Sequence, residues 1–140
     1  MQEAEREKVA TWMPEITTFE KPFWDSLQND RVLLVQKCED CGHIQFPPSP
    51  VCTSCLSEAV SWVPCSGRAR LWSKVVLHKQ YLEPYPDTPY SVALAKLEEG
   101  PIVTGRMTNE NADRTALDAP VAIRYVTTVD GTVLVEFVPA

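Results

Sequence analysis

Hydrophobic and polar residues alternate along the second half of the chain, as they do along half-buried β-strands. Near the C-terminus, for example, Val133, Val135 and Phe137 fall on one face of an extended segment. The pair Asp130-Gly131 favours a tight type I′ hairpin turn just before this segment. The alternation predicts five strands, at residues 68–81, 90–97, 102–108, 121–127 and 132–138.

Five short antiparallel strands are too few for a β-sandwich and suit a small closed barrel, such as an OB-fold. The segments between these strands are rich in proline, glycine, aspartate and asparagine, which favour turns. We therefore expect turns at 84–89, 98–101, 109–120 and 130–131.

The N-terminal part of the chain is expected to be helical. Residues 2–12 form a polar helix, and a second helix begins near Pro22, since proline is tolerated in a first turn. Phe23, Trp24 and Leu27 form an apolar patch on this second helix. Trp12, Phe19 and Trp24 form either a buried core or a patch that awaits a partner.

Four cysteines form two Cys-x-x-Cys pairs that are separated by ten residues. Each pair brings two thiolates to one side of a tight turn, and together they complete a tetrahedral shell that Zn²⁺ favours and iron tolerates. Because four thiolates leave no open position for water or substrate, we expect a structural metal, with disulfides as the alternative. The predicted ligands are Cys38, Cys41, Cys52 and Cys55.

The β-rich run at residues 31–37 leads directly into the first of these cysteines and is expected to enter a zinc ribbon. The sequence thus predicts a mainly β protein with short N-terminal helices. Its expected divisions are a helical segment at 1–30, a zinc ribbon at 31–65 and a five-stranded OB-fold barrel at 66–140.

The chain carries a net charge of −6 at pH 7, which argues against generic binding to nucleic acids or anionic membranes. No apolar run approaches the length of a bilayer span, and the charged N-terminus lacks the apolar centre of a signal peptide. Cysteines used as metal ligands, together with an unpaired Cys65, fit a reducing compartment. We therefore expect a cytoplasmic protein in which Cys65 is a half-buried thiol between the two modules.

One predicted strand departs from the acidic character of the chain. Residues 68–79 contain four Lys or Arg and no acid, so the rest of the chain carries −10 (−6 minus +4). Even-numbered residues of an extended strand share one face, which would here combine positive charge with an aromatic ring. Such a face suits coenzyme A, another anionic small molecule, a partner protein or single-stranded nucleic acid, unless it is only a solvated surface. The candidate residues are Arg68, Arg70, Trp72, Lys74 and His78.

No catalytic residue is predicted. The carboxylates lie in turn-like segments, and the sequence places neither a nucleophile–base pair nor a phosphate-binding glycine loop. His43 would be surplus to a filled metal shell and is expected either next to the metal ligands or at the surface.

The order of these motifs resembles the DUF35 family. The resemblance rests on Phe23-Trp24, Cys38-x-x-Cys41-Gly42, Phe46-Pro47-Pro48, Cys52-x-x-Cys55, Ser66-Gly67-Arg68, the segment from Pro89 to Leu94 and the segment from Val135 to Pro139. It implies a rubredoxin-like zinc ribbon followed by an OB-fold.

The resemblance also implies a function. DUF35 proteins are non-catalytic accessory subunits that stabilise a partner and help to hold its CoA ester. The implied partner is a thiolase-like catalytic subunit in a hetero-oligomer, so the chain would be part of an acyl-CoA acyltransferase complex. In size the chain is similar to the small subunits of benzoylsuccinyl-CoA thiolases. The alternatives are an accessory subunit of a MaoC-like enoyl-CoA hydratase or a lipid-transfer-type aldolase, a single-strand nucleic-acid-binding OB protein, and a rubredoxin-like iron electron carrier.

Overall fold

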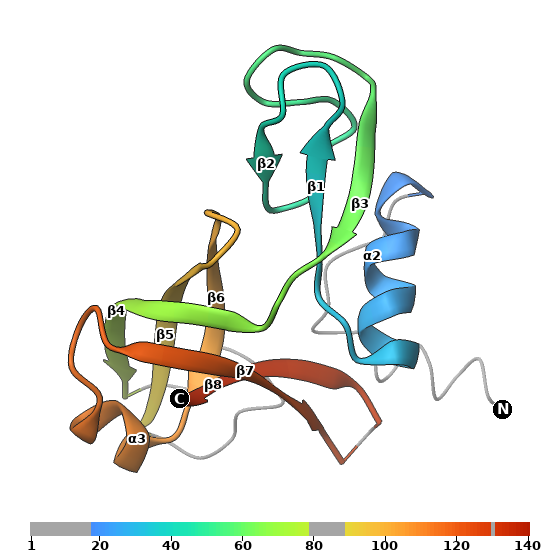
Figure 1. Ribbon diagram of the computed structural model, residues 1–140. Helices are drawn as coiled ribbons and strands as arrows, with labels where there is room; N and C mark the ends of the chain where they lie inside the picture. Colours follow the sequence, from blue (N-terminus) through green and yellow to red (C-terminus); the bar gives the residue numbers. More distant parts are fainter. Residues whose placement is uncertain (1–17, 79–88, 130) are drawn as a thin grey trace, which may run out of the picture.

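The computed structural model describes residues 18–78, 89–129 and 131–140. Two β lobes and one helical segment make up this part of the chain, and Figure 1 shows the smaller lobe standing above the larger one. The smaller lobe is a three-stranded sheet of order β2-β1-β3, and the larger is a closed barrel of order β4-β5-β6-β8-β7. The predicted fold class is therefore confirmed.

The helical segment precedes the first strand. A short 3-10 turn, Thr18–Glu20, leads into α2, Lys21–Asp25, and a π-helical turn, Ser26–Asp30, completes the segment. Phe23 and Leu27 lie one turn apart and are buried, whereas Trp24 is half-buried and packs edge-on against Phe23 at 5.1 Å between ring centroids. The apolar patch thus forms core, and the expected helix at 2–12 lies outside the described residues.

The smaller lobe contains β1, Leu34–Cys38, between the short β2, Ile44–Gln45, and β3, Val60–Pro64. All pairings in this sheet are antiparallel. The strand predicted at 31–37 begins three residues later than expected and includes Cys38, so this cysteine is held by the sheet itself.

The barrel contains five strands, close to the predicted ranges. They are β4, Arg68–Leu77, β5, Tyr90–Leu97, β6, Ile102–Met107, β7, Pro120–Thr127, and β8, Val133–Pro139. Neighbouring strands of the barrel are antiparallel, except β6 and β8, which pair in parallel. The register pairs Ile123 with Phe137 and Tyr125 with Val135, as the alternation of the last two strands requires.

The segment expected to be a turn at 109–120 contains a helix, α3, Asn109–Arg114. Thr108 caps it, because its hydroxyl accepts a hydrogen bond from the backbone N–H of Asn111 at 3.2 Å. Ala112 is buried and anchors the helix against the barrel. The prediction of a turn was wrong for this helix. It relied on the polar residues of the segment, which are typical of turns, and overlooked Thr108 as an N-cap.

The two lobes are joined by hydrogen bonds as well as by the chain. The backbone N–H of Leu33 donates to Tyr125 Oη at 2.9 Å, and its carbonyl accepts from Cys65 N at 3.0 Å. The Gln28 side chain makes two bonds to the backbone of Val133, with its Nε2 donating at 2.9 Å and its Oε1 accepting at 2.8 Å. Cys65 is half-buried at this junction, and burial raises the pKa of its thiol. The helical segment and β1 are therefore fastened to β7 and β8.

No helix in the parts of the chain that the structure describes is long and apolar enough to cross a membrane.

Gly105 on β6 faces the barrel core, where there is no room for a side chain. A Cβ built on it would lie 2.6 Å from Cε2 of Phe137, which is fully buried. We expect Gly105→Ala to lower the free energy of unfolding by about 1–3 kcal/mol, because the aromatic ring would have to move. Urea unfolding of this variant, with Thr104→Ala on the exposed face of β6 as control, measures the effect. Equal stabilities would mean that the core relaxes freely around Phe137.

Candidate metal centre and barrel pocket

The two cysteine pairs meet at the end of the smaller lobe. Cys38 and Cys52 are buried, whereas Cys41 and Cys55 are exposed, and all four sulfurs lie within 4.8 Å of one another. Zn–S bonds of about 2.3 Å place the sulfurs of a tetrahedral site about 3.8 Å apart. The Cys38–Cys55 and Cys41–Cys52 sulfur pairs are both 3.6 Å apart, too far for disulfide bonds. The donor set therefore fits a tetrahedral metal ion.

Backbone N–H groups point at sulfur, as they do in metal knuckles. The N–H of Cys41 lies 3.4 Å from Cys38 Sγ and lowers the pKa of this thiol to about 7. The backbone N–H of Ser57 lowers the pKa of Cys55, but the neighbouring sulfurs of Cys38 and Cys41 outweigh it and raise that pKa to about 12. Four thiolates cannot share this volume without a cation, because like charges in close contact oppose ionisation.

Two buried glutamines hold the second pair of cysteines against the sheet. Gln45 Nε2 donates to Gln36 Oε1 at 2.8 Å, and Gln45 Oε1 accepts from the backbone N–H of Thr53, inside the second knuckle, at 2.8 Å. Gln36 Oε1 also accepts from Ser49 N at 2.8 Å. His43 is exposed, and its Nε2 lies 3.3 Å from the Thr53 hydroxyl. Hydrogen-bonded side-chain amides thus position the loop that carries the second pair of cysteines.

The predicted basic face is interrupted by a β-bulge. Pairing between β4 and β5 slips between Leu71 and Ser73, which leaves Trp72 as the extra residue. Before the bulge, Leu71 faces inward beside buried Ala95; after it, Lys74 pairs with buried Ala93. Since directly opposed residues share a face, the bulge moves the later even positions to the other side of the strand. The expectation of one common face was wrong for this reason.

Lys74 and His78 are therefore separated from the other candidates. Lys74 Nζ donates to the carbonyls of Ala112 at 2.6 Å and Thr115 at 2.8 Å, so it caps the C-terminal end of α3. His78 is exposed and follows the end of β4. Lys74 serves the fold through these bonds.

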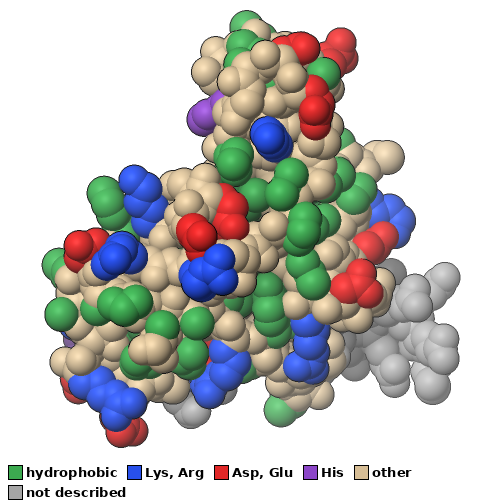
Figure 2. Space-filling model, viewed as in Figure 1, with side chains coloured by type: hydrophobic (Ala, Val, Ile, Leu, Met, Phe, Trp, Pro, Cys, Tyr) green, Lys and Arg blue, Asp and Glu red, His purple; other side chains and the backbone are tan. Residues whose placement is uncertain are grey.

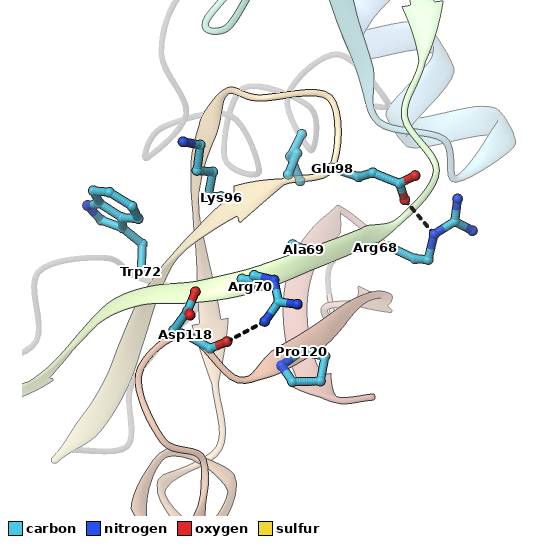
Figure 3. Close-up of a pocket in the computed structure, with 9 residues that line it drawn as sticks. Arg68, Ala69, Arg70, Trp72, Lys96, Glu98, Asp118 and Pro120 are labelled. Carbon is cyan, nitrogen blue, oxygen red and sulfur yellow. Dashed lines mark hydrogen bonds and ion pairs between the residues drawn. The ribbon is translucent and has the colours of Figure 1, made fainter.

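The remaining candidates line a pocket of about 590 Å³ on the barrel, drawn in Figure 3. The Trp72 ring is 56% exposed, and Lys96 Nζ lies 5.4 Å from its centroid, within cation–π distance. Arg70 donates to the backbone carbonyl of Asp118 at 2.8 Å, and Arg68 pairs with Glu98 at 2.5 Å.

The pocket has mixed charge. Three cations and two carboxylates line it, and Figure 2 shows basic and acidic side chains side by side over the barrel lobe. Arg68 is neutralised by Glu98, whose pKa is lowered through a hydrogen bond from that guanidinium. Arg70 and Lys96 are thus the two cations of this pocket for which the described part of the chain shows no carboxylate partner. The arrangement suits a ligand with one flat ring and a small number of negative charges.

A second cavity of about 390 Å³ is mostly apolar and lies between the helical segment, the smaller lobe and the barrel. Phe23, Trp24, Phe46 and Tyr90 are among the residues that line it. Of the aromatic residues on the helical segment, Phe19 remains 36% exposed.

Comparisons with known proteins divide the chain into two domains that correspond closely to the two lobes of the structure. One family model, ChsH2 rubredoxin-like zinc ribbon domain, matches residues 29–61, and another, ChsH2 C-terminal OB-fold domain, matches residues 62–126. A DUF35 domain-containing scaffold protein from Methanothermobacter thermautotrophicus is 30% identical over 91 residues, which are 64% of this chain and 68% of the relative. The chain belongs to the DUF35 family.

Two further relatives carry the names of enzyme subunits. The 3-oxo-4,17-pregnadiene-20-carboxyl-CoA hydratase alpha subunit of Mycobacterium tuberculosis is 32% identical over 104 residues, 74% of this chain and 32% of the relative. A probable enoyl-CoA hydratase alpha subunit of Thermomonospora curvata is 29% identical over 120 residues, 84% of this chain and 37% of the relative. This DUF35 chain thus spans about a third of the length of these two relatives.

Two solved structures resemble this DUF35 chain over most of its length. A chain of the Ltp2-ChsH2(DUF35) aldolase matches with a TM-score of 0.78 and 25% identity, covering 90% of this chain and 98% of that one. A DUF35 protein from Sulfolobus solfataricus matches with a TM-score of 0.62 at 14% identity, which shows the fold alone.

Sequence reasoning missed Lys96 and Asp118 as pocket residues of this DUF35 chain. Lys96 is the direct cross-strand neighbour of Arg70, and Asp118 follows α3 in a left-handed conformation with φ of 67°. The alternation of β5 places Lys96 on its outer face, but only the register between strands brings it beside Arg70.

We expect Cys52→Ser to unfold the ribbon lobe, because the binding energy of a structural metal is also folding energy. Metal content by mass spectrometry should fall well below that of the wild type, and limited proteolysis should cut between residues 38 and 60. Cys65→Ser is the matched control, since Cys65 lies outside the four-sulfur cluster and should retain the metal. A Cys52→Ser protein with full metal content and an intact ribbon would contradict this role.

Proposed function

We propose that this chain is a non-catalytic accessory subunit of an acyl-CoA enzyme complex, in which it stabilises a catalytic partner. The observation that carries the proposal is the likeness to the Ltp2-ChsH2(DUF35) aldolase chain, which extends over 90% of this chain and 98% of that one. Relatives named as CoA hydratase subunits support the same class of complex. No nucleophile–base pair was found in the sequence to suggest chemistry of its own.

The metal in this proposal is a structural Zn²⁺ ion. Cys38, Cys41, Cys52 and Cys55 would bind it, as their sulfur separations of 3.6 Å and their full thiolate set support. Bound Zn²⁺ would offset half of the negative charge of the thiolates and hold the ribbon lobe rigid. Colourless protein with one equivalent of zinc is the expected result, whereas red protein would indicate iron.

The partner is a catalytic subunit of the hydratase or aldolase class, which the names of the relatives support. A thiolase-like subunit, which the family resemblance led us to expect, remains the alternative within the same role. Either partner would supply the catalytic groups, while this chain would supply a rigid lobe and a docking surface.

The role of this chain toward the CoA ester lies in the barrel pocket. We infer that the adenine ring of coenzyme A stacks on Trp72 and that Arg70 and Lys96 contact its phosphates. The cavity of about 590 Å³ and the aromatic platform with two cations beside it support this assignment. Arg68 is occupied by Glu98, and Lys74 caps α3, so neither is assigned to the ligand.

Copurification tests the accessory role. The tagged chain, recovered from extract of its own cells, should bring down one acyl-CoA enzyme subunit at near-equal amount, identified by mass spectrometry. The tag alone is the control, and activity of that enzyme should fall when this chain is removed. Recovery of the chain alone or with RNA would overturn the proposal.

Calorimetric titration with coenzyme A tests the pocket. We expect Trp72→Ala to weaken binding at least about fivefold, since stacking of a base on an aromatic ring contributes about 1–3 kcal/mol. Lys74→Met is the matched control, because it removes a cation of the same strand on its other face and should leave affinity unchanged. Circular dichroism verifies that both variants are folded. Tighter binding of an oligonucleotide than of coenzyme A would instead favour single-stranded nucleic acid as the ligand.

A further inference from the structure

The two metal knuckles have the same backbone turn but different residues at its last position. In the first knuckle, Gly42 N donates to the carbonyl of Cys38 at 2.9 Å, with φ of 79°. In the second, Leu56 N donates to the carbonyl of Cys52 at 2.9 Å, with φ of 66°. Glycine adopts this left-handed conformation freely, whereas a bulky side chain opposes it. Leucine at this position therefore costs the isolated chain stability.

The Leu56 side chain gains little from burial in return, since it is 74% exposed. Arg31 and Asp118, the other non-glycine residues with positive φ in the described chain, differ in this respect. The Arg31 guanidinium donates to Thr127 Oγ1 at 2.6 Å, and the Asp118 carbonyl accepts from Arg70. Leu56 thus combines an unfavourable backbone with an apolar side chain directed to solvent, as expected of a residue kept for contact with another molecule.

The surroundings of Leu56 specify the charge of that molecule. Residues 38–67 contain three acids, Glu39, Asp40 and Glu58, and no Lys or Arg. Ser57, next to Leu56, donates to the Asp40 carboxylate and keeps this acid beside the knuckle. The loop between β2 and β3 forms the top of the ribbon lobe in Figure 1, and Figure 2 shows acidic side chains near that tip with one basic side chain below them. An apolar knob with an acidic rim fits an apolar pocket rimmed by Lys and Arg.

We propose that Leu56 is an anchor by which the ribbon tip docks into a basic-rimmed apolar pocket of the catalytic subunit. The inference rests on the proposed function, which supplies that subunit. A second copy of this chain is a poor occupant, because its own ribbon tip is acidic and would repel the first, and its barrel pocket carries the carboxylates of Glu98 and Asp118. A small molecule is a poor occupant too, because Leu56 projects from the surface instead of lining a cavity.

Leu56→Gly distinguishes a role in docking from a role in folding, because it should maintain or raise stability while it lowers affinity for the catalytic subunit. The metal-loaded full chain should keep or raise its thermal midpoint, since the backbone strain is relieved. Its dissociation constant for the purified catalytic subunit, identified by copurification, should rise at least about tenfold, as for an interface anchor. Leu117→Gly makes the same change at a leucine that is 59% exposed on the barrel lobe and should bind like the wild type.

Each other outcome has a distinct meaning. If Leu56→Gly binds the catalytic subunit with the same affinity as the wild type, the anchor is overturned and the accessory role stays intact. A clear fall in the thermal midpoint assigns Leu56 to the fold and also overturns the anchor. If Leu117→Gly loses as much affinity for the catalytic subunit as Leu56→Gly does, the effect is not specific to the ribbon tip, and the anchor is overturned. If the wild-type chain binds no acyl-CoA enzyme subunit, the proposed function itself fails, and the anchor fails with it.

Discussion

Four cysteine thiols within 4.8 Å of one another can ionise together only around a cation, and the rest of the structure depends on this site. Cys38 closes β1, so the metal shell fixes the end of the central strand of the ribbon. The residue before β1, Leu33, is bonded to Tyr125 of the barrel and to Cys65 at the junction. A metal ion bound by the cysteines would therefore hold one end of β1, while hydrogen bonds to the barrel hold the other end.

A single inserted residue shapes the surface of that barrel. The bulge at Trp72 directs a large aromatic ring toward solvent and moves Lys74 to the opposite face, where it caps α3. On its opposite edge, β4 bonds with the loop after α3: Leu71 N–H donates to Ala119 O at 3.0 Å, and the Leu71 carbonyl accepts from Asp118 N at 2.7 Å. The bulge therefore places Trp72 at the pocket, and bonding on the opposite edge of β4 holds the loop that brings Asp118 to it.

Charge is distributed unevenly along this acidic chain. The ribbon from residue 38 to the junction has three acids and no cation, whereas residues 68–79 have four cations and no acid. The acidic ribbon tip with its exposed leucine and the barrel pocket, with its aromatic ring and two cations that have no carboxylate partner among the described residues, are two chemically distinct surfaces. The first suits a protein with a basic rim, and the second suits an anionic ligand with a flat ring.

The sequence by itself determined the features that rest on local chemistry. Paired cysteines, strict alternation and turn residues were sufficient for the four-sulfur cluster, the five strands and the order of the lobes, because each signal lies within a few adjacent residues. Tertiary structure alone decided the composition of the pocket and the role of Lys74. A bulge changes the face of every later residue, and Lys96 and Asp118 reach Arg70 only through pairing between distant segments. These outcomes depend on register and long-range packing, which no local pattern of residues encodes.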